Sequence, residues 1–475
     1  MEIMKYAIDD YKAVQAEEYI GIFGNPIKHT MSPIIHNTIS RQLSKDMRYI
    51  PFHITEDLGG AVKTAYEDGI VGLNITVPYK QEVMEHLADV DEAAKAIGAV
   101  NTLVRVDGGY KGYNTDMEGL AHSLMVEGVE LTNSRVIMLG AGGAARAVAY
   151  MCLKYGADRV YIVNRTFDNA KKIADDMNQT FGCDKLIPLS VEDYYIIPNG
   201  RYIMIQCTSV GLHEEDGLPL ILDESFYDKA QVGVDLIYNP ARTPFLKLIE
   251  ERGGKAINGL GMLLYQGVKA YELWNAVEVP EWLVKRVYHA LERVAYDNDE
   301  NVVLIGYMGS GKSTVGKFLA MVYGYDFIDT DELIEIKEGM SINNIFAEKG
   351  EDYFRQLETK VLVDLKGKLR NTVIATGGGM PVKEKNRPLL KELGKVFYLK
   401  ANYDTTYKRV SGGNGRPLLN NLEGNSLYQR IKEMTAIRTP IYTEVADVVI
   451  DTTQIDEQEV AREIATTMSS YAENV

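Results

Sequence analysis

The chain has 475 residues, 46% hydrophobic and 25% charged, which is long enough for about three globular domains and excludes a disordered or collagen-like protein. With 51 Lys and Arg against 67 Asp and Glu the net charge is −16, and a surface that acidic should repel nucleic acid and anionic membranes. Three cysteines without a CxxC spacing, no apolar leader and no apolar run of about 18 residues predict a soluble, cytoplasmic protein of a reducing compartment.

The polar, acidic segment 296–300 separates two parts of the chain. It follows an amphipathic helical pattern and precedes the apolar run 302–305, so we expect a linker over residues 293–300. Residues 1–300 hold 29 basic and 43 acidic residues, a net charge of −14, whereas the remaining 22 and 24 give −2. The last part can therefore still build a cationic pocket.

Short apolar runs alternate with helical patterns in the first part. These runs cover residues 19–24, 71–77, 135–140, 159–164 and 231–238. Strands that alternate with helices over such a length predict α/β domains with parallel sheets. The run that ends at Gly140 opens a second unit of nucleotide-binding type, so an internal boundary is expected near residues 117–130.

The segment 135–156 reads as a strand, a Gly-rich turn and a helix. Gly140, Gly142 and Ala145 fit the G-x-G-x-x-A pattern, in which backbone N–H groups reach a pyrophosphate at a helix N-terminus; such turns also occur for packing reasons. The next strand ends in Asn164-Arg165-Thr166, without the acidic residue typical of NAD sites. Arg165 can instead bind a 2′-phosphate, which predicts NADP, unless it is a solvated loop residue.

Six further segments of this part resemble shikimate dehydrogenase. They occur in that family's order over nearly all of residues 18–290: NPIKHTMSPIIHN (25–37), NITVPYK (74–80), GAVNTL (98–103), YNTDMEG (113–119), DLIYNPARTPFL (235–246) and NGLGMLLYQG (258–267). The resemblance implies a substrate domain over residues 1–116, completed by helices at about 260–292, and a Rossmann NADP-binding domain over residues 117–259.

Lys80 and Asp116 are the expected catalytic pair, and both should also touch the substrate. Reduction of a ketone by hydride needs a proton donor as the alkoxide develops, and a Lys ammonium beside a carboxylate can supply one. The position of this pair at the reacting carbon is implied by the resemblance. The alternatives are a surface lysine and a carboxylate that caps a helix N-terminus.

Other site residues follow from the resemblance and from the ligand's chemistry. Shikimate is a carboxylate with three hydroxyls, so its site needs hydroxyl and amide groups: Thr30, Ser32, Thr76, Asn101, Tyr238 and Gln266. The expected NADP contacts are Gly140, Ala141, Gly142, Gly143, Ala144, Asn164, Arg165, Thr166, Thr208 and Met262. Thr30 and Met117 stand where the family more often has Ser and Gly, and His29 and His36 are expected to be structural.

The segment 302–320 carries the full phosphate-loop pattern G-x-x-x-x-G-K-[ST], from Gly306 to Ser313. Loop N–H groups should bind phosphates, Lys312 should reach the β and γ phosphates as a catalytic residue, and the Ser313 hydroxyl should ligate Mg²⁺. The strand end in FIDTDELIE adds Asp329 to the Mg²⁺ ligands and Asp331 for a hydroxyl that attacks phosphorus. The expected ATP contacts of the loop are Gly309, Ser310, Gly311, Lys312, Ser313 and Thr314.

Three arginine-bearing segments and a glycine run complete a second resemblance. EDYFRQLE, GGNGRPLL, AIRTPIY and TGGGM (376–380), together with the loop, resemble shikimate kinase across residues 301–450. The resemblance implies a P-loop kinase domain over residues 301–475. Its implied acceptor contacts are Asp331, Arg355, Gly377, Gly378, Gly379 and Arg438. Arg409 and Arg416 should contact the nucleotide, Arg416 from a Gly-rich stretch that resembles a mobile lid.

Both parts therefore point to one small molecule. We expect an α/β protein that reduces 3-dehydroshikimate to shikimate with NADPH and then forms shikimate 3-phosphate with ATP and Mg²⁺, without nucleic-acid or membrane partners. One alternative is a quinate/shikimate dehydrogenase of looser cofactor choice fused to the same kinase. Others are a non-catalytic metabolite sensor on both folds and a P-loop module that acts on protein or nucleic acid, which the acidic balance opposes.

Overall fold

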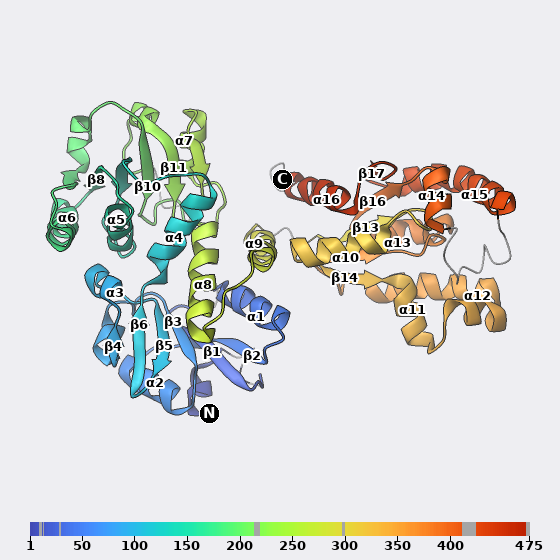
Figure 1. Cartoon of the computed structure of the whole chain (residues 1–475), viewed down its shortest axis with the longest axis horizontal. Helices are drawn as coiled ribbons and strands as arrows, with labels where there is room; N and C mark the ends of the chain where they lie inside the picture. Colours follow the sequence, from blue (N-terminus) through green and yellow to red (C-terminus); the bar gives the residue numbers. More distant parts are fainter. Residues whose placement is uncertain are drawn as a thin grey trace. The chain divides into compact units, whose positions relative to one another are not determined.

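The computed structural model describes residues 1–8, 12, 14–27, 30–212, 219–296, 300–410 and 424–471. The chain forms two compact units, Met1–Tyr296 and Asp297–Val475, each with its own hydrophobic core (Figure 1). Both units are α/β with parallel strand pairs, which confirms the predicted fold class. Within the described ranges, no helix is both long and apolar enough to cross a membrane.

The first unit begins with a mixed sheet in the order β2-β1-β3-β5-β6-β4. β1 pairs in parallel with β2 and β3, while β5 runs antiparallel to β3 and β6. β1 is buried along most of its length, as its apolar run YIGIFG predicts for a central strand. The strands are β1 (Glu18–Gly24), β2 (Met47–His53), β3 (Gly72–Ile75), β4 (Asp89–Val90), β5 (Thr102–Val106) and β6 (Gly109–Tyr113). The helices are η1 (Glu2–Tyr6), α1 (Ser32–Gln42), α2 (Leu58–Glu67), η3 (Glu82–His86) and α3 (Glu92–Ile97).

The second sheet of this unit is wholly parallel, in the order β12-β11-β10-β7-β8-β9. The chain leaves β7 toward β8 and later returns to its other side at β10, and ligands bind at the carboxyl ends of strands at such a reversal. The strands are β7 (Arg135–Leu139), β8 (Arg159–Asn164), β9 (Leu186–Ser190), β10 (Tyr202–Gln206), β11 (Ala230–Asp235) and β12 (Lys255–Ile257). The helices are α5 (Ala145–Lys154), α6 (Phe167–Phe181), η4 (Val191–Ile196), η6 (Glu224–Lys229) and α7 (Pro244–Glu251).

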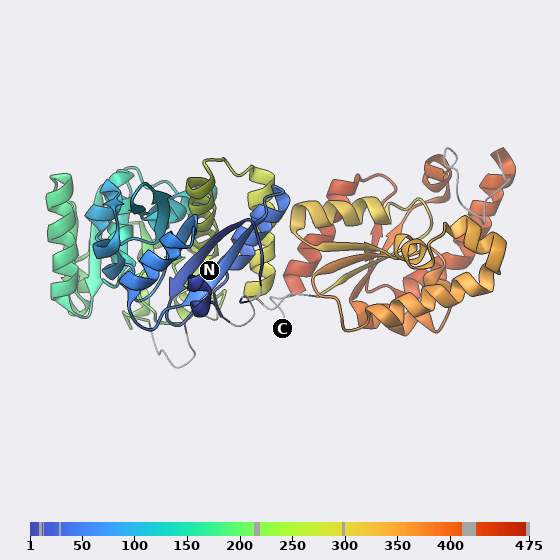
Figure 2. The same ribbon diagram turned by 90° about the horizontal axis from the view of Figure 1, so that it is seen from below.

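Helices α4 (Thr115–Val126) and α8 (Leu260–Asn275) lie side by side between the two sheets (Figures 1 and 2). They approach closely at Gly119, where a Cβ atom would lie 2.5 Å from the backbone nitrogen of Gln266. α4 packs into the core of the parallel sheet, whereas α8 and α9 (Glu281–Ala295) pack with β1, β2 and α1. The helix that follows the mixed sheet in the chain therefore packs on the parallel sheet. The two helices that follow the parallel sheet pack on the mixed sheet.

Two predicted boundaries differ from the structure. The cut between residues 116 and 117 falls in the first turn of α4, which begins at Thr115 because Asn114 caps it. The predicted linker began at residue 293, but α9 continues to Ala295 and Arg293 is buried. The amphipathic pattern of α9 includes residues 293–295, so these three residues are helical and are not part of the linker.

The second unit contains a parallel sheet (Figure 2). Its strand order is β14-β15-β13-β16-β17. Val302 and Leu304 of the central strand β13 face one core, and Val303 and Ile305 face the other, because successive side chains point to opposite faces. The strands are β13 (Val302–Ile305), β14 (Asp326–Asp329), β15 (Thr372–Ala375), β16 (Lys395–Lys400) and β17 (Val448–Asp451). The helices are α10 (Lys312–Tyr323), α11 (Thr330–Glu338), α12 (Ile342–Leu365), η7 (Met380–Val382), α13 (Asn386–Leu393), α14 (Tyr403–Val410), α15 (Gly424–Val445) and α16 (Glu457–Tyr471).

Candidate active sites

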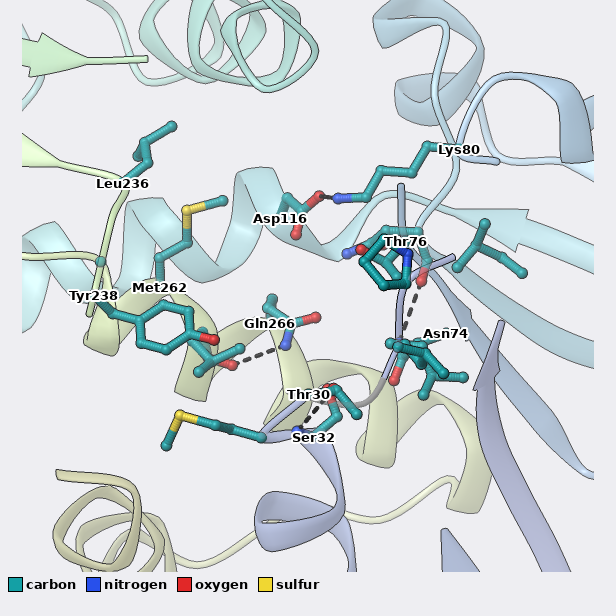
Figure 3. A pocket seen from close by; sticks show the side chains of 18 residues that line it. Thr30, Ser32, Asn74, Thr76, Lys80, Asp116, Leu236, Tyr238, Met262 and Gln266 are labelled. Atoms are coloured by element: carbon teal, nitrogen blue, oxygen red, sulfur yellow. Dashed lines mark hydrogen bonds and ion pairs between the residues drawn. The ribbon is translucent and has the colours of Figure 1, made fainter. Parts of the chain in front are cut away.

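A cavity of about 370 Å³ opens in the first unit where β3 ends beside α4 and α8 (Figure 3). Hydroxyl, amide and charged groups from six separate parts of the chain meet in it. All eight side chains expected to contact the substrate line this cavity: Thr30, Ser32, Thr76, Lys80, Asn101, Asp116, Tyr238 and Gln266. Met262, expected at the cofactor, lines it as well, and Met117 packs in the core beside it.

Lys80 and Asp116 form an ion pair at this cavity, with 2.7 Å between Nζ and Oδ2 (Figure 3). Lys80 lies in the turn after β3, and Asp116 lies in the first turn of α4. Asn114 caps α4 with its side chain, so Asp116 does not serve as the cap. Because the two side chains are 32% and 16% exposed, the pair remains reachable from the cavity. It can therefore donate a proton to a bound ligand.

A buried amide network fixes the wall behind this pair. Asn101 accepts a hydrogen bond from the backbone N–H of Thr115 at 2.8 Å and donates to the Thr115 hydroxyl at 3.0 Å, which anchors the start of α4. Asn74 lines the cavity too, although the sequence analysis did not select it. It accepts from the Tyr49 hydroxyl at 2.7 Å. The sequence does contain a signal for Asn74, because it lies on the same face of an extended segment as Thr76, which was expected to contact the substrate.

None of the described residues that line this cavity is a histidine. His36 is fully buried beneath the ring of Tyr49, with 4.3 Å between the ring centres, and burial lowers its pKa to about 3. It is therefore neutral at physiological pH. His29 lies outside the described residues.

The Gly-rich turn between β7 and α5 has the shape of a phosphate cradle. Gly140 has a φ of 106°, and a Cβ atom there would lie 2.6 Å from the Thr208 side chain. Apart from Gly143 and its two chain neighbours, no heavy atom of the described residues lies within 4 Å of a Cβ built on Gly143, so space remains over the start of α5. The Asn164 side chain accepts from the Ala141 N–H at 3.1 Å and donates to the Thr166 carbonyl at 2.9 Å, which joins the turn to the end of β8. The cradle fits a dinucleotide pyrophosphate.

Gly142 and Ala144 belong to the same turn, and Arg165 lies at the end of β8. Arg165 is exposed, and it forms no salt bridge with any residue that the structure describes. A guanidinium in this state keeps its donors available for a phosphate.

The phosphate loop of the second unit lies between β13 and α10. Its Lys312 donates from Nζ to the carbonyls of Gly306 and Tyr307, at 2.9 and 3.0 Å. Ser313 donates from its hydroxyl to Asp329 Oδ2 at 2.6 Å. A hydroxyl beside a carboxylate is an oxygen donor set of the kind that Mg²⁺ prefers, so these two residues fit the predicted metal site.

A cavity of about 300 Å³ adjoins this loop. Arg409 donates to the carbonyls of Gly309 and Thr452, and so places its guanidinium against the loop. The predicted nucleotide contacts that line this cavity are Gly309, Ser310, Gly311, Thr314 and Arg409. Arg416 lies outside the described residues.

A separate cavity of about 230 Å³ lies at Asp331 and the glycine run 377–379. All six predicted acceptor contacts line it: Asp331, Arg355, Gly377, Gly378, Gly379 and Arg438. A Cβ atom at Gly377 would lie 2.5 Å from Asp331 Oδ1, and one at Gly379 would collide with the Arg355 guanidinium. Only glycine lets the backbone approach both charged groups.

Glu358 is a further charged group of this cavity that the sequence analysis did not select. Both of its oxygens accept hydrogen bonds from Arg355, at 2.9 and 3.0 Å, and Glu351 accepts from the other edge of the same guanidinium. Burial raises the pKa of Glu358 to about 7. Burial, and next the neighbouring Asp329, raise the pKa of Asp331 to about 6. Both carboxyls therefore titrate near neutral pH.

Both units match known protein families. Family models match four segments: the shikimate dehydrogenase substrate-binding domain (residues 22–103), shikimate/quinate 5-dehydrogenase (120–193), the shikimate 5′-dehydrogenase C-terminal domain (259–292) and shikimate kinase (308–469). An NADP⁺ shikimate dehydrogenase of Carboxydothermus hydrogenoformans is 40% identical over 267 residues, which cover 56% of this chain and 94% of that protein.

Solved structures resemble the first unit. The chorismate mutase/shikimate 5-dehydrogenase fusion of Clostridium acetobutylicum is 35% identical with a TM-score of 0.53, over 59% of this chain and 99% of that chain. The Thermus thermophilus shikimate 5-dehydrogenase in complex with NADP(H) and shikimate is 30% identical with a TM-score of 0.51, over 58% and 99%. A 5-ketofructose reductase of Gluconobacter is 31% identical, also with a TM-score of 0.51, over 58% and 98%.

Proposed function

The chain belongs to the shikimate dehydrogenase family and carries a shikimate kinase domain after it, so it is a bifunctional shikimate-pathway enzyme, and we propose that each of its two units catalyses one of two consecutive reactions. The first unit reduces 3-dehydroshikimate to shikimate, and the second converts shikimate to shikimate 3-phosphate. The observation that carries this proposal is the Lys80–Asp116 ion pair in a cavity lined by hydroxyl and amide groups.

In the first reaction, NADPH supplies the hydride when it is bound at the cradle. Lys80 donates a proton from Nζ to the oxygen of the carbonyl under reduction, and Asp116 holds that ammonium in place at 2.7 Å. The surrounding groups, among them Thr30, Ser32 and Gln266, bind the hydroxyls and the carboxylate of the substrate. The rigid start of α4 keeps Asp116 at a fixed position, which favours proton transfer in one geometry.

In the second reaction, ATP with Mg²⁺ supplies the phosphoryl group. Lys312 binds the phosphates, and Ser313 and Asp329 hold the metal. Asp331 accepts a hydrogen bond from the acceptor hydroxyl and takes its proton, while Arg355 and Arg438 bind the acceptor carboxylate. Glu358 positions Arg355 through its two hydrogen bonds.

Two assays on the purified chain test this proposal. We expect NADPH oxidation on addition of 3-dehydroshikimate, and separate ADP release on addition of shikimate with ATP and Mg²⁺. A non-catalytic sensor would bind these ligands without turnover. The quinate/shikimate alternative predicts, in addition, reduction of NADP⁺ by quinate. The Gluconobacter 5-ketofructose reductase has a similar fold, so the assay uses 3-dehydroshikimate itself as the ketone.

We further propose that the chain works in the cytoplasm with small-molecule partners alone. NADPH and ATP are available there, and the three cysteines are free thiols, as expected in a reducing compartment.

Arg165→Ala should raise the KM for NADPH about tenfold and leave the KM for 3-dehydroshikimate unchanged, because an exposed charge-assisted phosphate contact contributes modestly. The steady-state rates of the wild type with NADPH and with NADH give the reference. Arg201→Ala, at another exposed arginine of the same sheet region, is the matched control. Equal use of NADH and NADPH by the wild type would refute the 2′-phosphate contact.

The kinase kcat/KM for shikimate should rise between pH 5 and 7, with an apparent pKa near the value of about 6 for Asp331. Burial raises this pKa, so the carboxyl is protonated at pH 5 and cannot accept the hydroxyl proton until the pH passes about 6. Rates are measured at saturating ATP, and retained dehydrogenase activity of each sample excludes unfolding. A flat profile, or one that falls with rising pH, would contradict this role.

A further inference from the structure

The acceptor cavity of the second unit has an uncharged polar side chain besides its arginines and carboxylates. Asn343, in the first turn of α12, lines the same cavity as Asp331, Arg355 and Arg438. Its neighbours Ile342 and Phe346 are apolar, and Ser341 lines the cavity beside them.

The first turn of α12 is fixed by hydrogen bonds on both sides of Asn343. The Ile342 N–H donates to Glu335 Oε1 at 2.8 Å, and the Asn344 N–H donates to the Ser341 hydroxyl at 3.3 Å. Ser341 thereby caps the helix. A turn anchored in this way fixes the backbone from which the Asn343 side chain extends, without using the side chain itself.

The Asn343 carboxamide oxygen is shielded from solvent, yet it accepts no hydrogen bond from any residue that the structure describes. An unsatisfied buried acceptor is costly, and such a group in a native cavity needs a partner from outside the chain. Asp331 Oδ1, which we assign to the acceptor hydroxyl, is in the same state in the same cavity. Both oxygens are therefore buried acceptors without a hydrogen bond from the described residues, and both residues line the same cavity.

We propose that the Asn343 carboxamide binds a second hydroxyl of the acceptor, one that is not phosphorylated, and so selects polyhydroxylated rings. Its oxygen accepts from this hydroxyl, and its N–H group can donate to the oxygen of an adjacent hydroxyl. Shikimate offers two hydroxyls besides the reacting one. This inference rests on the proposed kinase function and adds a specificity-determining residue to it.

The test is a cycle between protein variants and acceptor analogues in the full chain. Asn343→Ala should raise the KM for shikimate about three- to tenfold, with kcat within twofold and the KM for ATP unchanged. 4-Deoxyshikimate and 5-deoxyshikimate each lack one of the two hydroxyls that do not react. For the analogue that lacks the hydroxyl bound by Asn343, the wild type and the variant should have equal KM values. Asn344→Ala, at the exposed neighbouring residue, is the matched control and should behave as the wild type.

Asn343→Asp keeps the acceptor oxygen and the size of the side chain, so it provides a second test of the proposal if the alanine variant folds poorly. It should retain discrimination against one deoxy analogue. If Asn343→Ala has the wild-type KM for shikimate, or raises the KM for all three acceptors by one factor, the inference is overturned while the kinase function stands. If the wild type fails to phosphorylate shikimate, both are overturned.

Discussion

Lys80→Ala is expected to lower the dehydrogenase kcat by about 10²- to 10⁴-fold, the range over which a general acid contributes. The alkoxide that forms as hydride arrives would then lack its proton donor, since Lys80 is the ammonium that lines the cavity at 2.7 Å from Asp116. The measurement is steady-state NADPH oxidation at saturating 3-dehydroshikimate. The kinase rate of the same preparation should stay within twofold of the wild type, because its site lies in the other unit.

Two further substitutions separate charge from proton transfer. Lys80→Arg keeps a cation beside Asp116 but cannot release its proton readily, so kcat should stay low while the KM for 3-dehydroshikimate changes little. Lys63→Ala removes a highly exposed lysine of α2 and should leave both activities unchanged. A Lys80→Ala enzyme that keeps a third or more of the wild-type turnover would show that the proton comes from another group.

Asp331→Asn should lower the kinase kcat by about 10²- to 10⁴-fold, because the amide cannot accept the proton of the attacking hydroxyl. The side chain keeps its size, so the KM for shikimate should change only a few-fold while Arg355 and Arg438 still bind the carboxylate. ADP release with shikimate is the measurement. NADPH oxidation by the same protein should be unaffected.

Asp352→Asn is the control for this change, since Asp352 is exposed on α12 and outside the acceptor cavity. A loss confined to KM, with kcat preserved, would mean that Asp331 binds the acceptor without taking its proton.

Local sequence signals were sufficient to predict the nucleotide-binding elements. The strand 302–305, the loop that follows it and the helix that starts at Lys312 occur where the pattern places them. The same holds for the strand before Gly140 and for the strand that ends at Asn164. In each case the apolar run, the glycines and the helix are contiguous, so one short segment carries the whole signal.

The remaining site residues depend on contacts between distant segments. Glu351 and Glu358 both flank Arg355 at helical spacing, and no local feature distinguishes them. The Glu358 side chain is only 1% exposed and that of Glu351 is 52% exposed, because the glycine run covers one side of α12 alone. The roles of such residues are set by packing, which a linear pattern does not report.

The most direct measurement of the central claim is a single reaction that contains the purified full chain, 3-dehydroshikimate, NADPH, ATP and Mg²⁺. Phosphorus NMR follows the phosphate ester, and absorbance follows NADPH. We predict that shikimate 3-phosphate appears only when all four are present, and that each molecule of it accompanies one NADPH oxidised and one ADP formed. Oxidation of NADPH without any phosphate ester, when ATP and Mg²⁺ are present, would contradict a chain that performs both steps.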